Sequence, residues 1–261
     1  MLELYHWEPN TFSLKVLIAL KEKGLAFESR YHDPTDFSEG AGPPALNLEA
    51  ENNPEAEGPI LVHQGEAITE SFFILEYLDD AFPETVALRP GDPEEDWRVR
   101  VWARFLGERT APSVATLGCK TYLVPALRER RLNDASVLDR FKTEERRIAW
   151  SQALNDSYSD ADLTESRRKV ALTVERIEEA LANSDWLVAG RYTMADIAAF
   201  AFANCLPTLA PEVCNDTVSP RTMAWLKRMR ARPAVRESLA MSKTGKPQEA
   251  FAPGPEHARW G

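Results

Sequence analysis

The sequence has few cysteines and histidines, and neither residue type occurs in a spacing that indicates a disulfide framework or a metal site. The three cysteines form no C-x-x-C pair, and the four histidines show no metal-ligand spacing. We therefore expect no metal. An odd number of cysteines without a pattern is typical of reduced thiols, which favours a cytoplasmic location. These cysteines are Cys119, Cys205 and Cys214.

Long apolar runs and an excess of positive charge are also missing. No run approaches the roughly 20 apolar residues that span a bilayer, and Met1–Tyr5 lacks the basic and apolar segments of a secretory signal. The chain has 31 Lys and Arg residues against 41 Asp and Glu residues, a formal net charge of −10. We therefore expect neither a membrane nor a nucleic acid as the partner.

The 261 residues, 44% of them hydrophobic, are enough for one large or two modest domains. Near the start, Leu2–Tyr5 is a strand candidate. A helical apolar pattern then covers Ser13–Lys23 and ends at Gly24, and a second strand candidate follows at Phe27–Tyr31. Residues 33–57 are rich in Pro, Gly, Asn and acidic side chains, so we expect mainly loop there.

The most informative segment runs from Pro59 to Leu78. Two short apolar runs flank Gln64-Gly65, which predicts a β-hairpin. A helix is expected directly afterwards, with Ser71 as a plausible N-cap. The resulting order of strands and helices, β-α-β followed by β-β-α, predicts a thioredoxin-like domain over residues 1–80.

The rest of the chain reads as helical. Residues 81–96 contain several prolines and glycines and indicate an interdomain linker, and residues 97–240 indicate an all-helical domain. Within it, Thr193 and Asp196 have the spacing of a capping box, which we interpret as structural. The Pro- and Gly-rich residues 241–261 predict a loosely ordered tail. The expected helices include residues 96–109, 137–153, 165–182 and 221–231.

Pro59, the Glu70-Ser71 pair and the Thr193-x-x-Asp196 helix start occur in an order that resembles the glutathione transferases. The resemblance covers about residues 2–240. It implies a fold of class α/β plus all-α, in which an N-terminal thioredoxin-like domain binds glutathione and is followed by an all-helical substrate domain. It also implies a homodimer, or a heterodimer with a related subunit.

Further segments look like the bacterial β-etherases, a branch of this family that cleaves lignin-derived β-aryl ethers with glutathione. This second resemblance implies a small aromatic substrate and a thiolate attack that releases a phenol. The segments are Leu4-Tyr5, Ser13–Lys15, Glu22–Leu25, Asp33-Pro34, Ile74–Leu78, Arg89-Pro90, Arg100–Trp102, Thr116–Gly118, Val174–Glu179 and Ala201–Asn204.

A thiol nucleophile must be ionised, and a free thiol has a pKa of about 8.5. A hydroxyl donor at a helix N-terminus favours the thiolate. Ser13 matches the serine that the family places beside the glutathione sulfur, so the resemblance implies that Ser13 is the catalytic residue; a plain N-cap serine is the alternative. Asn10 and Thr11 lie in the same turn and are weaker candidates for glutathione binding.

The resemblance implies further contacts to glutathione. Pro59 would be a cis-proline, and the backbone of Gly58 before it would bind the cysteinyl part. Ser71 and its helix N-terminus would hold the γ-glutamyl carboxylate, and Glu70 the γ-glutamyl ammonium. An ordinary capped helix start is the alternative for this pair.

The chain departs from many relatives in one respect. Residues 33–60 contain no Lys, Arg or His that could bind the glycyl carboxylate of glutathione, so we expect weak binding unless a cation such as Lys15 or a partner's arginine reaches it. A weakly active or non-catalytic subunit of a heterodimer and a general detoxifying transferase therefore remain as alternatives. The acidic residues of this segment are Glu39, Glu49, Glu51, Glu55 and Glu57.

The electrophile is expected to bind in the helical domain. Five side chains there could line an aromatic pocket that faces Ser13, although aromatic residues at helical spacing are more often core. They are Trp102, Phe105, Thr116, Tyr122 and Trp150.

Overall fold

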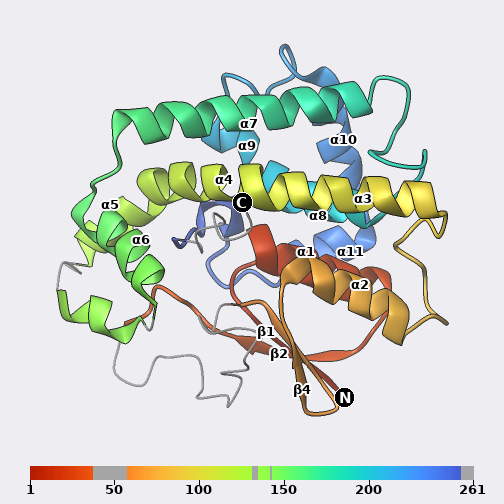
Figure 1. Ribbon diagram of the computed structural model, residues 1–261, viewed down its shortest axis with the longest axis horizontal. Helices are drawn as coiled ribbons and strands as arrows, with labels where there is room; N and C mark the ends of the chain where they lie inside the picture. The colour runs from red at the N-terminus through yellow and green to blue at the C-terminus, as the bar shows by residue number, and fades with distance from the viewer. Residues whose placement is uncertain (38–57, 131–134, 142, 254–261) are drawn as a thin grey trace.

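The structure, a computed structural model, describes residues 1–37, 58–130, 135–141 and 143–253. It consists of a small sheet covered by two helices and a larger helical part stacked on those helices (Figure 1). This arrangement confirms the predicted thioredoxin-like unit followed by an all-helical unit.

The sheet has four strands in the order β2-β1-β3-β4. Strand β1 pairs in parallel with β2 and antiparallel with β3, and β3 pairs antiparallel with β4. The turn of the β3–β4 hairpin is Gln64-Gly65, where both residues have positive φ angles, 55° and 88°. That geometry suits a two-residue hairpin turn, and the predicted hairpin is confirmed. The strands are β1 (Leu2–His6), β2 (Phe27–Tyr31), β3 (Ile60–His63) and β4 (Glu66–Ile68).

Helices α1 (Thr11–Glu22) and α2 (Ser71–Ala81) lie side by side between the sheet and the helical part (Figure 1). Helix α1 begins two residues earlier than expected, so Ser13 is not its N-cap. Ser71 is likewise the first residue of α2 rather than its N-cap, which is Glu70. In both places the chain turns into the helix before the serine, so each hydroxyl lies within the first turn.

The first long helix of the helical part runs almost unbroken from residue 93 to residue 129. Its segments are α3 (Pro93–Phe105), the π-helical η1 (Leu106–Thr110), α4 (Ala111–Gly118), the π-helical η2 (Cys119–Leu123) and α5 (Val124–Glu129). No helix in the described ranges is long and apolar enough to cross a membrane.

The later elements surround a core that includes Trp225 and Phe200. The helix predicted over residues 137–153 is wrong at its start, because a short 3-10 helix precedes a separate α-helix there. The elements are η3 (Ala135–Arg140), α6 (Glu144–Asn155), α7 (Asp160–Ala180), α8 (Met194–Ala203), α9 (Leu206–Leu209), α10 (Pro220–Ala231), α11 (Pro233–Leu239) and η4 (Pro247–Glu249).

The capping box at the start of α8 is confirmed. The buried Asp196 carboxylate accepts hydrogen bonds from the backbone N–H groups of Thr193 and Leu187, at 3.0 and 3.1 Å, and from Trp225 Nε1 at 3.0 Å. One carboxylate thus joins the start of α8 to the preceding loop and to α10.

A second buried carboxylate, Asp79 of α2, joins the two parts of the molecule. It accepts hydrogen bonds from Lys23 Nζ at 2.8 Å and from the backbone N–H groups of Leu88 and Arg89, at 3.0 and 2.7 Å. The carbonyl of Leu88 in turn accepts from the Met194 N–H at 2.9 Å, at the first residue of α8. The segment interpreted as a linker is therefore fixed to both sides.

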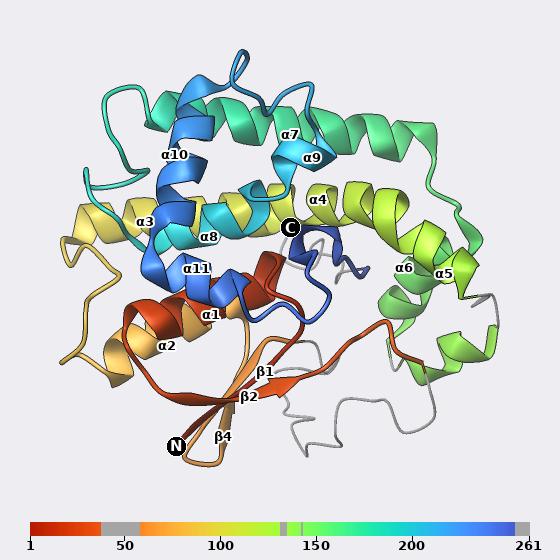
Figure 2. The same ribbon diagram turned by 180° about the vertical axis from the view of Figure 1, so that it is seen from behind.

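The C-terminal tail differs from the expectation of loose order. Its described residues, 241–253, lie against the start of α1 and against α4 (Figure 2), and Phe251 is buried. Low helical periodicity in a Pro- and Gly-rich segment indicates irregular backbone, but irregular backbone can still pack. Residues 254–261 lie outside the described part of the chain.

Candidate functional site

The turn between β1 and α1 carries Ser13 into the first turn of α1. The Ser13 hydroxyl oxygen accepts a hydrogen bond from the backbone N–H of Trp7 at 3.2 Å, and the side chain is almost fully buried. Within the described residues its hydroxyl proton has no acceptor. The proton is therefore free to be donated to a sulfur held beside the helix N-terminus.

Asn10 and Thr11, the weaker candidates, form the corner of the same turn. Asn10 is buried; its Nδ2 donates to the carbonyl of Ala250 at 2.9 Å, while its Oδ1 has no hydrogen-bond partner in the described part of the chain. Thr11 has a φ angle of 43°, in the left-handed region that β-branched residues avoid. The corner is thus held in a defined, strained shape.

The Gly58–Pro59 peptide bond is cis, as predicted. It precedes β3, which pairs with β1, and a Cβ added to Gly58 would lie 3.6 Å from the carbonyl oxygen of Tyr5. That distance is an ordinary contact, so the space around residue 58 does not demand glycine. The acidic residues discussed above, Glu39 to Glu57, lie outside the described residues.

Glu70 and Ser71 stand at the N-terminus of α2. Glu70 has φ 63° and ψ 103°, another uncommon conformation for a residue with a side chain. The Ser71 hydroxyl accepts a hydrogen bond from Lys15 Nζ at 3.3 Å. This contact brings the second turn of α1 to the start of α2.

Lys15 is only 4% exposed. Its amine lies 4.5 Å from the ring centroid of Phe202 and 4.9 Å from that of Phe12, and it forms no ion pair with any residue the structure describes. Burial lowers the pKa of Lys15 to about 7, and the carboxylate of Glu70 opposes this only in part. The sequence had suggested Lys15 for the glycyl end of glutathione; the structure places it at the serine expected to hold the γ-glutamyl end.

A cleft of about 940 Å³ lies between α4, α6 and α7. Phe12, the neighbour of Ser13, lines it together with Pro253 of the C-terminal tail, so the cleft reaches the turn between β1 and α1. Apolar and polar side chains alternate along its walls, among them Thr116 and Tyr158. Phe12 was missed in the sequence; only its position beside Ser13 could have indicated it.

Of the five side chains expected to line an aromatic pocket, only Thr116 lines this cleft. Trp102 and Phe105 pack edge-to-face, with centroids 6.1 Å apart, in α3. Trp150 is fully buried, and Tyr122 stacks on a ring of the C-terminal tail. The other four do not line this cleft, which agrees with the alternative that aromatic residues at helical spacing are more often core.

The protein's own thiols are poor nucleophiles. Cys119 lines the cleft but is buried, and burial raises its pKa to about 12. Burial also raises the pKa of Cys205 to about 12 and that of Cys214 to about 11. Among the described residues no cluster of His, Cys, Asp and Glu side chains could hold a metal. Burial thus disfavours a thiolate on any of these three cysteines.

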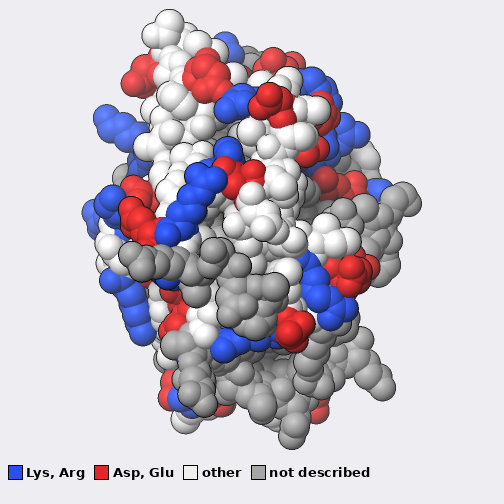
Figure 3. All heavy atoms as spheres, turned by 90° about the vertical axis from the view of Figure 1, so that its left-hand side faces the viewer, with Lys and Arg blue, Asp and Glu red and all other residues white. Residues whose placement is uncertain are grey.

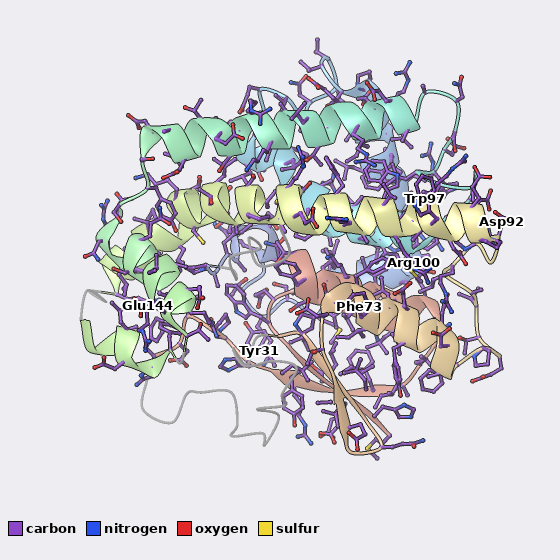
Figure 4. All side chains as sticks on the ribbon, in the orientation of Figure 1. Tyr31, Phe73, Asp92, Trp97, Arg100 and Glu144 are labelled. Carbon is purple, nitrogen blue, oxygen red and sulfur yellow. The ribbon has the colours of Figure 1, made fainter. Side chains whose placement is uncertain are left out.

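The surface also offers features outside the cleft. On the face that carries α6 and the start of α7, the acidic and basic side chains of the described residues are interspersed with uncharged ones (Figure 3). On the side of α2 and α3, Phe73 and Trp97 are 62% and 60% exposed. They lie near Arg100, which binds Glu76 at 2.7 Å (Figure 4).

Comparisons with known proteins match both parts of the molecule. Residues 4–86 match the glutathione S-transferase N-terminal domain, and residues 144–233 match the glutathione S-transferase C-terminal domain. Protein LigF of Sphingobium sp. strain SYK-6 is 35% identical over 249 residues, which are 93% of this chain and 94% of that protein.

Solved structures agree as well. The crystal structure of β-etherase LigF from the same organism superposes with a TM-score of 0.81 at 33% identity, covering 92% of this chain and 99% of that one. A glutathione S-transferase of Methylobacterium radiotolerans, solved with glutathione sulfonate, gives a TM-score of 0.67 at 25% identity. That match covers 91% of this chain and 94% of the other.

Proposed function

Because the chain belongs to the glutathione S-transferase family, we propose that it uses glutathione to cleave β-aryl ether bonds of aromatic ketones. The observation that carries this proposal is the 35% identity to LigF across 93% of the chain, since the LigF structure is that of a β-etherase. The buried, high-pKa cysteines support it, because the nucleophilic sulfur must then belong to a co-substrate. Reduced glutathione and reduced cysteines both suit the cytoplasm.

Glutathione would lie along the edge formed by the cis-proline and the two helix N-termini. The γ-glutamyl carboxylate would bind the Ser71 hydroxyl, the backbone N–H groups at the start of α2 and the amine of Lys15. Glu70 would accept from the γ-glutamyl ammonium, and the backbone at Gly58-Pro59 would bind the cysteinyl part. In this arrangement Lys15 supplies the cation that an anionic tripeptide needs.

The Ser13 hydroxyl would donate its free proton to the glutathione sulfur and so lower the thiol pKa. The thiolate would attack the carbon that bears the aryloxy group, next to the ketone. The C–S bond forms as the C–O bond breaks, and the leaving phenoxide takes a proton from solvent to become the phenol. The products are a thioether of glutathione and a free phenol, with no net oxidation or reduction.

The cleft between α4, α6 and α7 would hold the aromatic ketone. Phe12 at the catalytic end offers a ring for stacking, and the volume of about 940 Å³ is large enough for a substrate with two aromatic rings. The protein's main contribution is alignment, because holding thiolate and carbon in the attack geometry removes much of the entropic barrier.

The test is to incubate the purified protein with glutathione and a β-aryl ether ketone, then to quantify the phenol and the thioether. Equal amounts of both products, absent without glutathione, are expected. A protein that instead conjugates simple activated aryl halides and leaves the ether intact would be a general transferase. Binding of glutathione without turnover of either electrophile would identify a non-catalytic subunit.

We also propose that the molecule works as a dimer through the side of α2 and α3. Two large apolar side chains, Phe73 and Trp97, are mostly exposed there, beside the Arg100–Glu76 ion pair that can reorganise across an interface. A second copy, or a related subunit with the same surface, would bury them.

A further inference from the structure

The described end of the chain, Ser242–Pro253, forms a strap that crosses the catalytic turn. It leaves α11, passes the start of α1 and reaches α4, as the dark blue segment of Figure 2 shows. Only the short η4 within it is regular. The strap is nevertheless attached at three points, each made by specific side chains.

The first attachment is the carboxylate of Glu8, in the turn between β1 and α1. It accepts hydrogen bonds from the Lys243 and Thr244 N–H groups at 2.8 and 3.2 Å and from the Ser242 and Thr244 hydroxyls. Tyr31 (labelled in Figure 4) donates to it as well, at 2.8 Å. Burial alone would raise the pKa of Glu8, but these donors hold it below its usual value.

The second attachment is Asn10, which donates to the carbonyl of Ala250 at 2.9 Å. Glu8 and Asn10 therefore bind the strap from the two ends of the same three-residue turn. Phe12, two residues after Asn10, lines the cleft together with Pro253 at the end of the strap. The strap is thus part of the cleft wall where the wall meets the catalytic turn.

The third attachment is Phe251, which is 3% exposed. Its ring lies over Gly118 so closely that a Cβ on that residue would be 2.3 Å from two ring carbons. The ring also stacks on Tyr122, one helical turn further, with the planes 9° apart. A glycine inside a helix is less favourable than alanine, and here it makes the space that Phe251 fills.

We propose that Glu8 and Phe251 are positioning residues of the active site. By docking the strap at its two ends they hold the Glu8–Asn10 turn, and with it Ser13, in place against the cleft. They touch neither glutathione nor the electrophile; they act through the strap. The kinetic consequences rest on the proposed function, but the docking itself does not.

Gly118→Ala tests the docking from the helix side without changing the strap. The added methyl collides with the Phe251 ring, so the strap should detach, although alanine is otherwise the better helix former. Phe251→Ala should detach it from the other side. Glu249→Gln is the matched control, because Glu249 lies on the same strap but pairs, among the described residues, only with the exposed Lys246.

Limited trypsin digestion reads the docking directly. Lys243 is the cleavable site on the strap, since Lys246 precedes a proline, and in the wild type its N–H and amine are engaged by Glu8 and the Tyr31 ring. Wild type and Glu249→Gln should resist cleavage there, whereas Gly118→Ala and Phe251→Ala should be cut rapidly after Lys243. Equal cleavage in all four proteins would overturn the docking.

Kinetics then separate positioning from general stability. We expect kcat/KM for the ether to fall about 10- to 100-fold in Gly118→Ala and in Phe251→Ala, the scale of a misplaced catalytic group. The Kd of S-methylglutathione should change less than about threefold, because Lys15, Glu70 and Ser71 do not touch the strap. The double variant should be no worse than Phe251→Ala, and Phe251→Leu should recover part of the loss.

Additive losses in the double variant would contradict the proposal, because both changes act on one contact. A fall in kcat/KM that is accompanied by weaker glutathione binding and a lower melting temperature would also overturn it, since it would indicate global destabilisation. If the wild type cleaves no ether, the proposed function fails, while the trypsin results still decide whether Glu8 and Phe251 dock the strap.

Discussion

Lys15→Met removes the buried amine that the structure places at the start of α2 and keeps an unbranched side chain of similar length. Lys15 Nζ lies 3.3 Å from the Ser71 hydroxyl and over the rings of Phe12 and Phe202. Among the described residues, no carboxylate forms an ion pair with it. Without ligand, the folded protein must either bury a positive charge or release a proton. The substitution should therefore change the pH dependence of stability and weaken glutathione binding.

The sign of the stability effect follows from the two pKa values. In the folded protein burial lowers the pKa of Lys15 to about 7, against 10.5 for an ordinary lysine. Between these values the unfolded chain binds more protons than the folded one, so the free energy of unfolding rises with pH by up to about 1.4 kcal/mol per unit. From pH 7 to pH 9 the wild type should gain about 2 kcal/mol relative to Lys15→Met. Urea unfolding at pH 7, 8 and 9 measures this difference.

Folding releases the Lys15 proton in this pH range, whereas ligand binding should take a proton up. A γ-glutamyl carboxylate beside Lys15 favours the ammonium form, so ligand binding at pH 8 should take up close to one proton. S-methylglutathione has no ionisable thiol, so calorimetry in two buffers of different ionisation enthalpy isolates this proton. A hydrogen bond between charged groups contributes about 1.5–3 kcal/mol, so Lys15→Met should bind about 10- to 100-fold more weakly.

Lys21→Met is the matched control, because Lys21 lies on the same helix but is partly exposed and pairs loosely with Glu237 at 3.9 Å. It should change neither the pH profile of stability nor the binding of S-methylglutathione. The reasoning is refuted if Lys15→Met binds S-methylglutathione as tightly as the wild type and no proton is taken up at pH 8.

Three other variants, one of them a double substitution, test the site and the fold. Ser13→Ala should slow turnover and raise the thiol pKa of bound glutathione. The melting temperature should fall little, because the Ser13 hydroxyl is not a helix cap. Thiolate absorbance in the ultraviolet, measured against pH, gives the thiol pKa, and an unchanged value would remove Ser13 from the mechanism. Thr193→Ala should lower the free energy of unfolding by about 1–2 kcal/mol at unchanged kcat, and a kcat loss without destabilisation would contradict the structural role. Phe73→Ser combined with Trp97→Ser should convert a dimer to a monomer in sedimentation, whereas Val218→Ser, an exposed apolar residue elsewhere, should not.

Turns and helix caps could be predicted from the sequence, because residues close together in the chain determine them. Gln64-Gly65 can adopt two positive φ angles, so the hairpin followed from two residues. The Thr193–Asp196 capping box followed from a spacing of three residues. The start of α1 could not be placed as well, because Asn10, Thr11 and Ser13 are all acceptable near a helix N-terminus and the tertiary contacts of Asn10 decide among them.

The site was predictable only as far as the family resemblance reached. Ser13, Glu70 and Ser71 were predicted from their order, but the role proposed for Lys15 depends on α1 and α2 lying side by side, a contact across 56 residues. The docking of the strap could not be predicted from the sequence, since Glu8 and Lys243 are 235 residues apart. A charged side chain with no local partner gives no signal of where its partner lies.

The Asp79 junction bears on how the molecule melts. The residues between the two parts are not a free tether: Leu88 gives its N–H to Asp79 of the sheet unit and accepts, through its carbonyl, the first N–H of α8. Opening the sheet unit therefore leaves the Leu88 N–H without its acceptor, and opening the helical part leaves the Leu88 carbonyl without its donor. We expect a single calorimetric transition whose van't Hoff and calorimetric enthalpies agree, and Asp79→Ala should split it into two.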